Sequence, residues 1–307
     1  MPIAPALVEE GYQLFLGRPP APKARSAFET VPTLLETLMS SREFKNSPRS
    51  VKHRYGWPRA QHAVLREHRI LYCPIGKNAC SFLKRQIVKI SGLPQQDLLM
   101  RNVHLLTDRV NTGLQLSDYP PEICDEILND PAYFRFALLR DPMDRLLSGY
   151  MEKFVLNRMA PGNMRHTRSV VEAMQQKRGL ERVDFDLGIS FREFVTHVTT
   201  VPMETLDPHW IAQANYLEGI DWTLYEFGAI NRLIADLEAR TGVELPRQAV
   251  NSTGSGKGDP VPGAADLLPG QIVEQGRIAR ESFWDEGLSA AVKTSYAADY
   301  ALLEQVS

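Results

Sequence analysis

The stretch that most constrains this chain is CPIGKNACSF, residues 73–82. An apolar and aromatic run at residues 70–73 leads into it and is typical of a buried strand that stops at the following proline and glycine. Downstream, apolar residues recur at helical spacing over residues 79–90. The pattern predicts a strand, a tight loop and a helix, with Lys77 at the helix N-terminus.

A loop of this kind is a natural anion site. The first N–H groups of a helix have no intrahelical partner, the helix dipole adds partial positive charge, and Lys77 adds a full charge. The ATP-type phosphate loop requires a serine or threonine directly after its lysine, as a magnesium ligand. Here Asn78 follows Lys77, and the first hydroxyl comes at Ser81. The loop therefore favours a phosphate held without a metal.

A second segment, YFRFALLRDPMDRLLSGY at residues 133–150, repeats this arrangement. Residues 133–139 predict a strand, and Asp141 is a suitable N-cap for the helix that follows. Arg140 at the strand end and Ser148 on the helix could hold a second phosphate through bidentate and single hydrogen bonds. By itself this motif fits an ordinary surface pair of Arg140 with Asp141 equally well.

Taken together, the two segments resemble the 5′-phosphosulfate loop and the 3′-phosphate motif of the carbohydrate sulfotransferase family, which includes the chondroitin, dermatan and natural-killer-epitope sulfotransferases. The resemblance implies an α/β sulfotransferase fold, a P-loop NTPase-like parallel sheet flanked by helices. It also implies transfer of a sulfuryl group from 3′-phosphoadenosine-5′-phosphosulfate to a hydroxyl of a carbohydrate or glycolipid, without a metal. The donor-binding residues carried over by position are Gly76, Lys77, Asn78, Ala79, Cys80, Ser81, Phe82, Arg140 and Ser148.

The resemblance extends over residues 68–302. Residues 207–213, DPHWIAQ, are similar to the family's His-Trp-x-x-Gln segment. An aromatic strand at residues 221–227 and a helix at residues 229–240 are expected to follow. Residues 250–255 resemble the family's Asn-Ser loop, which implies that Asn251 and Ser252 lie near the nucleotide.

Sulfuryl transfer needs a cation for the charge that builds on the leaving oxygen and a base for the acceptor hydroxyl. Lys77 is placed for the first role. Candidates for the base are His104, which lies between the two phosphate motifs as the catalytic histidine does in related 2-O-sulfotransferases, and His209 in the His-Trp segment. Glu152 is a third candidate. The sequence leaves the choice open, because a lone histidine is more often structural.

Composition favours a folded enzyme. Of the 307 residues, 43% are hydrophobic and 23% charged, which is typical of a globular protein. The formal net charge of -2 argues against binding bulk nucleic acid. Neither an apolar run of about 18 residues nor an export signal is visible, so we expect no transmembrane segment. Animal members of the family that the chain resembles usually carry an N-terminal Golgi anchor, so the resemblance implies a cytoplasmic, bacterial-type enzyme. The 3 cysteines lack metal-ligand spacing and are expected to be free thiols.

The predicted organisation is an N-terminal helical segment at residues 1–50, with helices at 7–16 and 31–39, followed by the catalytic domain at residues 51–307. The basic stretch at residues 158–182 predicts either a mobile, solvent-exposed connection between helices or a lid that binds an acidic acceptor. Two alternative functions stay open. A kinase-like phosphotransferase is disfavoured by the missing magnesium-binding hydroxyl, and a non-catalytic nucleotide-binding module would retain Lys77 but lack a base.

Overall fold

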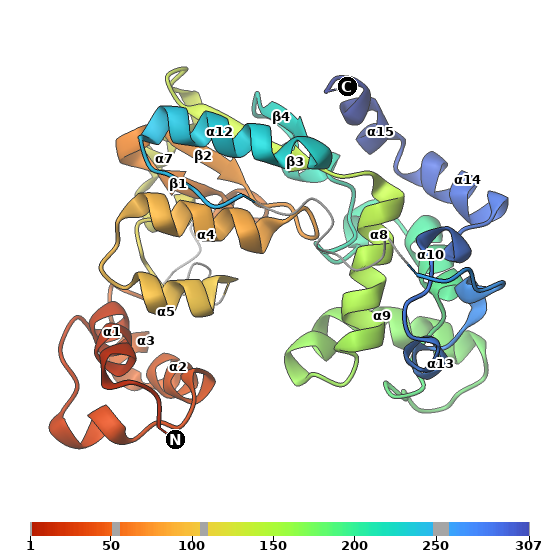
Figure 1. Ribbon diagram of the computed structural model, residues 1–307, viewed down its shortest axis with the longest axis horizontal. Helices are drawn as coiled ribbons and strands as arrows, with labels where there is room; N and C mark the ends of the chain where they lie inside the picture. Colours follow the sequence, from red (N-terminus) through yellow and green to blue (C-terminus); the bar gives the residue numbers. More distant parts are fainter. Residues whose placement is uncertain (1, 51–55, 105–109, 248–257, 307) are drawn as a thin grey trace.

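The computed structural model describes residues 2–50, 56–104, 110–247 and 258–306. At its centre lies a four-stranded sheet in the order β1-β2-β3-β4 (Figure 1). The strands are β1 (Ala63–Leu65), β2 (Ile70–Cys73), β3 (Phe134–Leu139) and β4 (Thr223–Glu226). Strands β2, β3 and β4 are parallel, and helices flank the sheet, which confirms the predicted α/β class.

One edge strand of this predominantly parallel sheet runs in the opposite direction to the others. β1 pairs with β2 in antiparallel orientation, with Val64 opposite Leu71. The link between them is only the 3₁₀ turn η3 (Arg66–His68) and the left-handed residue Arg69. A connection this short can make a hairpin, whereas a parallel crossover needs a dozen or more residues.

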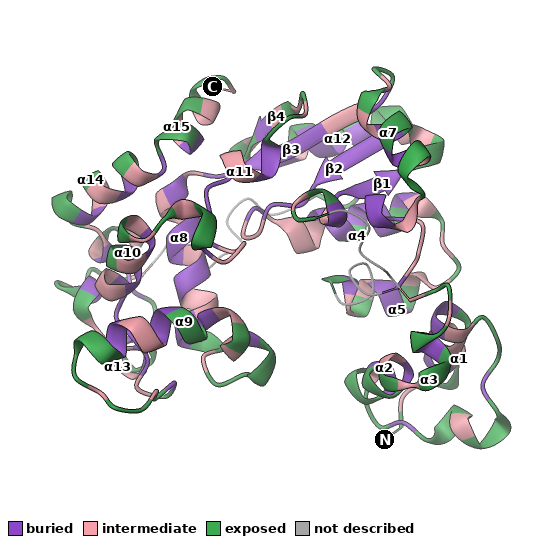
Figure 2. Cartoon of the chain, turned by 180° about the vertical axis from the view of Figure 1, so that it is seen from behind, coloured by how far each residue is buried: buried purple, intermediate pink, exposed green. Residues whose placement is uncertain are grey.

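Both faces of the sheet are covered, and β2 is buried along its whole length (Figure 2). Side chains alternate between the faces of a strand. Ile70 and Tyr72 pack in one cluster with helices α4 (Cys80–Ser91) and α12 (Ile230–Thr241). Leu71 packs on the other face with helix α7 (Pro121–Asn129). Because both faces of β2 are buried, its sequence is a continuous run of apolar and aromatic residues without polar positions between them.

A second group of helices packs around one large aromatic core that includes Tyr150, Phe154, Phe194 and Trp210, on the side of the sheet away from the N-terminal helices (Figure 1). Its elements are α8 (Pro142–Tyr150), the π-helical segment η5 (Met151–Leu156), α9 (Pro161–Lys177), α10 (Phe191–Thr200), α13 (Pro269–Gln275), α14 (Glu286–Ser295) and α15 (Ala297–Glu304).

The basic stretch at residues 158–182 is not the mobile, solvent-exposed connection that was one of the two predictions for it. Most of it forms α9, which buries Val170, Val171 and Met174 in the aromatic core. These apolar residues lie at helical spacing, so the helix has a core-facing stripe beneath its charged surface. Its basic residues are therefore held on a packed helix.

The N-terminal helices α1 (Pro5–Leu16) and α2 (Val31–Ser40) confirm the two predicted helices, and a short α3 (Arg42–Lys45) follows. Their buried side chains belong to the same hydrophobic cluster as α4 and α5 (Gln96–Arg101). The Leu98 N–H also donates to the Glu10 carboxylate at 3.0 Å. The division into domains at residue 50 stays a prediction.

Short elements connect the rest. They are the helix α11 (Ala214–Leu217) and the 3₁₀ turns η1 (Pro22–Ser26), η2 (Arg59–Gln61), η4 (Leu116–Asp118), η6 (Met203–Thr205), η7 (Phe227–Ala229), η8 (Ala264–Asp266) and η9 (Arg280–Phe283). Among the helices described, none combines the length and the apolar character that crossing a bilayer requires.

Candidate active site

A pocket of about 1020 Å³ opens where β2 and β3 end. Ligands of open α/β sheets bind at this carboxyl edge of the strands. Both phosphate motifs line it, as do His104 and His209. The predicted donor-binding residues in its wall are Gly76, Lys77, Ala79, Cys80, Ser81, Phe82, Arg140 and Ser148. Asn251 and Ser252 lie outside the described residues.

The loop after β2 carries two residues in left-handed conformations, Lys77 with φ 71° and Ala79 with φ 55°. Such angles are uncommon for residues with a side chain and gather at functional sites. Helix α4 begins at Cys80, so Lys77 precedes the helix and does not lie in its first turn. Left-handed residues recur in loops whose backbone N–H groups converge on an anion. The loop geometry thus suits an anionic ligand.

Asn78 is buried beneath the pocket, and its side chain faces the sheet. Its Nδ2 donates to Leu138 O at 2.7 Å and to Gln213 Oε1 at 2.5 Å. Gln213 Oε1 also accepts from the Arg140 N–H at 3.0 Å, while Gln213 Nε2 donates to Arg140 O at 2.8 Å. Gln213 therefore ties the first phosphate motif to the second. No local pattern indicates this role, because it depends on Asn78 and Arg140, which are far from Gln213 along the chain.

Arg145 performs a similar task from α8. Its side chain is 1% exposed and donates to three backbone carbonyls, Gly76 O at 3.0 Å, Ile211 O at 2.6 Å and Pro208 O at 3.3 Å. These bonds hold the loop after β2 against the His-Trp segment. Arg145 thus braces the pocket from below.

Arg140 is a buried cation, 7% exposed. Its guanidinium donates to Lys77 O at 3.1 Å and lies over the Phe227 ring, 4.7 Å from its centroid. Burial lowers its pKa, partly offset by the charge of Asp144. Among the described residues, no carboxylate forms an ion pair with it. A guanidinium in this setting is suited to an anionic ligand, since an unpaired buried charge is costly.

Lys77 forms an ion pair with Glu152, which also lies 3.5 Å from Lys153 Nζ. Glu152 and Lys153 are part of the π-helical segment η5, where the helix begun by α8 widens. Such segments often occur at functional sites. Burial would raise the pKa of Glu152, but the nearby charge of Lys77 outweighs it and lowers that pKa. Glu152 is thereby a weak base near neutral pH.

His104 lies against the beginning of α4. Its Nε2 is 2.5 Å from Ser81 Oγ. Burial disfavours the Cys80 thiolate, but a hydrogen bond and charge from His104 outweigh this and lower the pKa of Cys80 to about 7. His104 therefore contacts Cys80 and Ser81, the end of the predicted 5′-phosphosulfate loop at residues 73–82, hereafter the donor loop.

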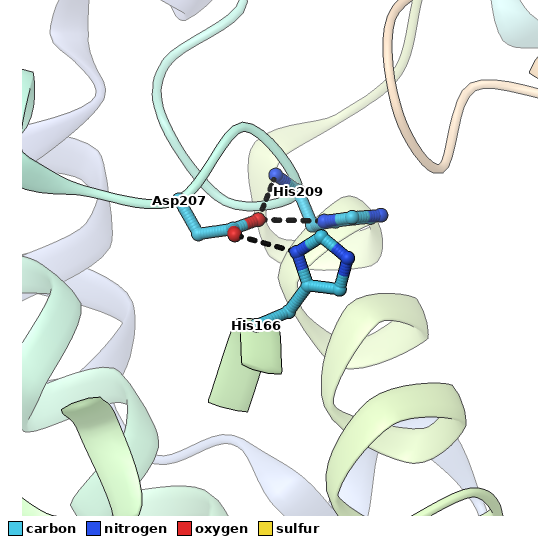
Figure 3. Close-up of side chains that lie close together, drawn as sticks. All are labelled: His166, Asp207 and His209. Atoms are coloured by element: carbon cyan, nitrogen blue, oxygen red, sulfur yellow. Dashed lines mark hydrogen bonds and ion pairs between the residues drawn. The ribbon is translucent and has the colours of Figure 1, made fainter. Parts of the chain in front are cut away.

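His209 belongs to a group of three side chains, with Asp207 and His166 (Figure 3). Its Nδ1 lies 2.6 Å from Asp207 Oδ1, which also accepts the His209 N–H at 2.9 Å. His166, from α9, places its Nδ1 2.8 Å from Asp207 Oδ2. The two imidazole rings are 4.7 Å apart and nearly perpendicular, at 73°. Sequence reasoning missed His166, because nothing in its own segment points to Asp207.

Within the described parts of the chain, this group alone brings three metal-ligating side chains together, with donor atoms within 4.8 Å. Ligands around a tetrahedral zinc ion would lie about 3.3 Å from one another, given Zn–N distances near 2.0 Å. The 2.6 and 2.8 Å separations found here are hydrogen-bond lengths. We therefore treat the three residues as a hydrogen-bonded group.

Comparison with known proteins points to one family. The family described as Sulfotransferase family matches residues 61–237. Carbohydrate sulfotransferase 14 of Danio rerio is 30% identical over 57% of this chain and 46% of that protein. Carbohydrate sulfotransferase 10 of Xenopus laevis is 29% identical over 50% of this chain and 43% of that protein. Carbohydrate sulfotransferase 11 of Rattus norvegicus is 27% identical over 54% of this chain and 48% of that protein.

The matches therefore cover about half the length of these curated relatives. No solved structure matches the chain. The family match includes the loop after β2, the motif after β3 and the His-Trp segment, whose residues the fold gathers around one pocket. As that match extends over more than half of the residues, this chain belongs to the sulfotransferase family.

Proposed function

We propose that this protein transfers a sulfuryl group from 3′-phosphoadenosine-5′-phosphosulfate to a hydroxyl of a carbohydrate. The observation that carries the proposal is that Lys77 and Arg140, from two separate phosphate motifs, line one pocket. A donor with anionic groups at both its 5′ and 3′ positions would engage both. The names of the relatives, all carbohydrate sulfotransferases, support a carbohydrate acceptor.

The residues present fit this donor. Arg140 is a buried guanidinium without an ion pair among the described residues, and Ser148 lines the same pocket. They would hold the 3′ phosphate. Lys77 and the first N–H groups of α4 would hold the 5′ end, and Lys77 would stabilise the charge that develops on the leaving oxygen. The donor supplies the sulfuryl group, and the protein supplies the anion site.

The base is best assigned to His209. Its ring is held by Asp207, and its Nε2 has no hydrogen-bond partner among the described residues. Glu152 is engaged by two lysines, and His104 lies against Ser81 in the donor loop. His209 therefore has the free lone pair and the fixed orientation that a general base needs.

Donor recognition provides the first test. We expect 3′,5′-adenosine bisphosphate to raise the melting temperature, with a stabilisation of about 2.7 kcal/mol at one hundred times its dissociation constant. Magnesium-ATP should have little effect. Arg140→Ala should remove most of the bisphosphate effect, because the 3′ phosphate loses its guanidinium. Differential scanning fluorimetry measures all three. An equal or larger shift with magnesium-ATP would favour the kinase-like alternative over a sulfotransferase.

We further propose that the acceptor is acidic, since Arg165 lines the pocket from α9. Arg165→Gln should raise the Michaelis constant for an acidic glycan about 10-fold and weaken its salt dependence. Arg168→Gln is the matched control, because Arg168 pairs with Glu172 at 3.2 Å and lies over Phe185. Steady-state kinetics at two salt concentrations compare the variants. Equal behaviour of both would show that α9 does not attract the acceptor.

A further inference from the structure

The structure shows an asymmetry between two histidines that share one carboxylate. His209 and His166 each direct Nδ1 at a different oxygen of Asp207 (Figure 3). Burial would raise the pKa of Asp207, but hydrogen bonds from His166 and His209 outweigh it and lower that pKa, so Asp207 is a carboxylate. A carboxylate only accepts hydrogen bonds. Both histidines must therefore carry a proton on Nδ1, which leaves the lone pair of each neutral ring on Nε2.

The second nitrogen distinguishes the two rings. Arg165 Nε donates to His166 Nε2 at 3.1 Å, so the lone pair of His166 is already engaged. His209 Nε2 points away from Asp207 and accepts no hydrogen bond from a described residue (Figure 3). Of the two imidazoles, only that of His209 has a lone pair available to take a proton.

We propose that Asp207 and His166 are positioning residues that fix His209 in the tautomer and orientation of the catalytic base. This inference rests on the proposed function, because it names how that reaction's proton is removed. In the step, the acceptor oxygen forms a bond to sulfur and the bond from sulfur to the bridging oxygen of the donor breaks. The hydroxyl proton moves to His209 Nε2, and 3′,5′-adenosine bisphosphate leaves. Asp207 stabilises the imidazolium that results.

The charged groups around His209 set its proton affinity. Lys153 and Glu152 face it from η5, His166 and Arg165 from α9, Lys77 from the loop after β2, and Arg145 lies behind Pro208. Burial lowers the pKa of His209, the charge of Lys153 lowers it further, and Asp207 opposes them; the net direction is down. The ring is therefore neutral, and able to accept a proton, above a pKa that lies below its usual value.

Two substitutions should move this pKa in opposite directions. Asp207→Asn removes the anion that raises it, so the acidic limb of the pH profile of kcat/KM should shift to lower pH. Turnover should also fall about 10²- to 10⁴-fold, because an amide allows the wrong tautomer. His166→Ala removes a hydrogen-bond donor that draws negative charge away from the Asp207 carboxylate. Asp207 should then stabilise the His209 imidazolium more strongly, so the limb should shift to higher pH, with a roughly 10-fold loss of turnover from the poorer orientation. His166→Asn should restore turnover, since its amide can donate to Asp207 as Nδ1 does.

Nitrogen-15 NMR of the imidazoles provides a readout that needs no substrate. We expect neutral His209 to carry its proton on Nδ1 in the native protein and to populate both tautomers in Asp207→Asn. A proton on Nε2 in the native protein, or pH limbs that move in the same direction, would overturn the inference. Turnover lost on chelation and restored by zinc would also overturn it, in favour of a metal site. If the NMR result holds but no acceptor is sulfated, it is the proposed function that fails.

Discussion

Replacing Lys77 with alanine is expected to lower turnover by about 10²- to 10³-fold, the usual cost of losing one group that stabilises developing negative charge. The affinity for 3′,5′-adenosine bisphosphate should change much less. Lys77 would meet charge that appears only as the bridging oxygen leaves, so its contribution is larger in the transition state than in the bound ground state. Single-turnover kinetics and calorimetric titration of the bisphosphate measure the two quantities separately.

Lys89→Ala is the control for this experiment. Lys89 lies near the other end of α4 and does not line the pocket. Its Nζ donates a hydrogen bond to Glu244 O, with a donor–acceptor distance of 2.6 Å. It should retain native turnover. A Lys77→Ala variant that loses bisphosphate affinity by the same factor as turnover would show that Lys77 binds charge present throughout, and would remove it from the leaving-group role.

Replacing His209 with alanine should lower turnover by about 10²- to 10⁴-fold, the range typical of a lost general base. The melting-temperature shift with 3′,5′-adenosine bisphosphate should persist, because Lys77, Arg140 and Ser148, which would hold the nucleotide, remain in place. The acidic limb of the pH profile should disappear. That limb reports protonation of the base, and burial places the pKa of His209 below its usual value, so native activity should fall only in mildly acidic solution.

His104→Ala separates the two histidine candidates. His104 contacts Ser81 and Cys80 in the donor loop, so its loss should weaken donor affinity and leave the acidic limb in place. Initial-rate measurements from acid to neutral pH on both variants decide between them. If the limb disappears with His104→Ala and survives His209→Ala, the base is His104 and the group around Asp207 has another role.

Local patterns in the sequence predicted the elements that carry the phosphate site. The apolar run before Pro74 is β2, and Asp141 caps α8 through its hydrogen bond from the Asp144 N–H at 3.0 Å. The predicted strand at residues 221–227 and helix at residues 229–240 match β4 and α12 within a few residues. These features depend on neighbours along the chain, which is why periodicity and capping residues suffice to find them. The cytoplasmic location and the bacterial type stay predictions.

The sequence by itself determined the α/β class, the two phosphate motifs and the family, because each rests on residues close together in the chain. Only the tertiary structure decided which catalytic candidates are oriented, and by what. His166 and Asp207 are 41 positions apart, and Lys77 and Glu152 are 75 apart. The contacts within these two pairs depend on how α9 and η5 pack over the carboxyl ends of β2 and β3. Hydrogen bonds and ion pairs between distant segments follow from that packing, and no local pattern encodes it.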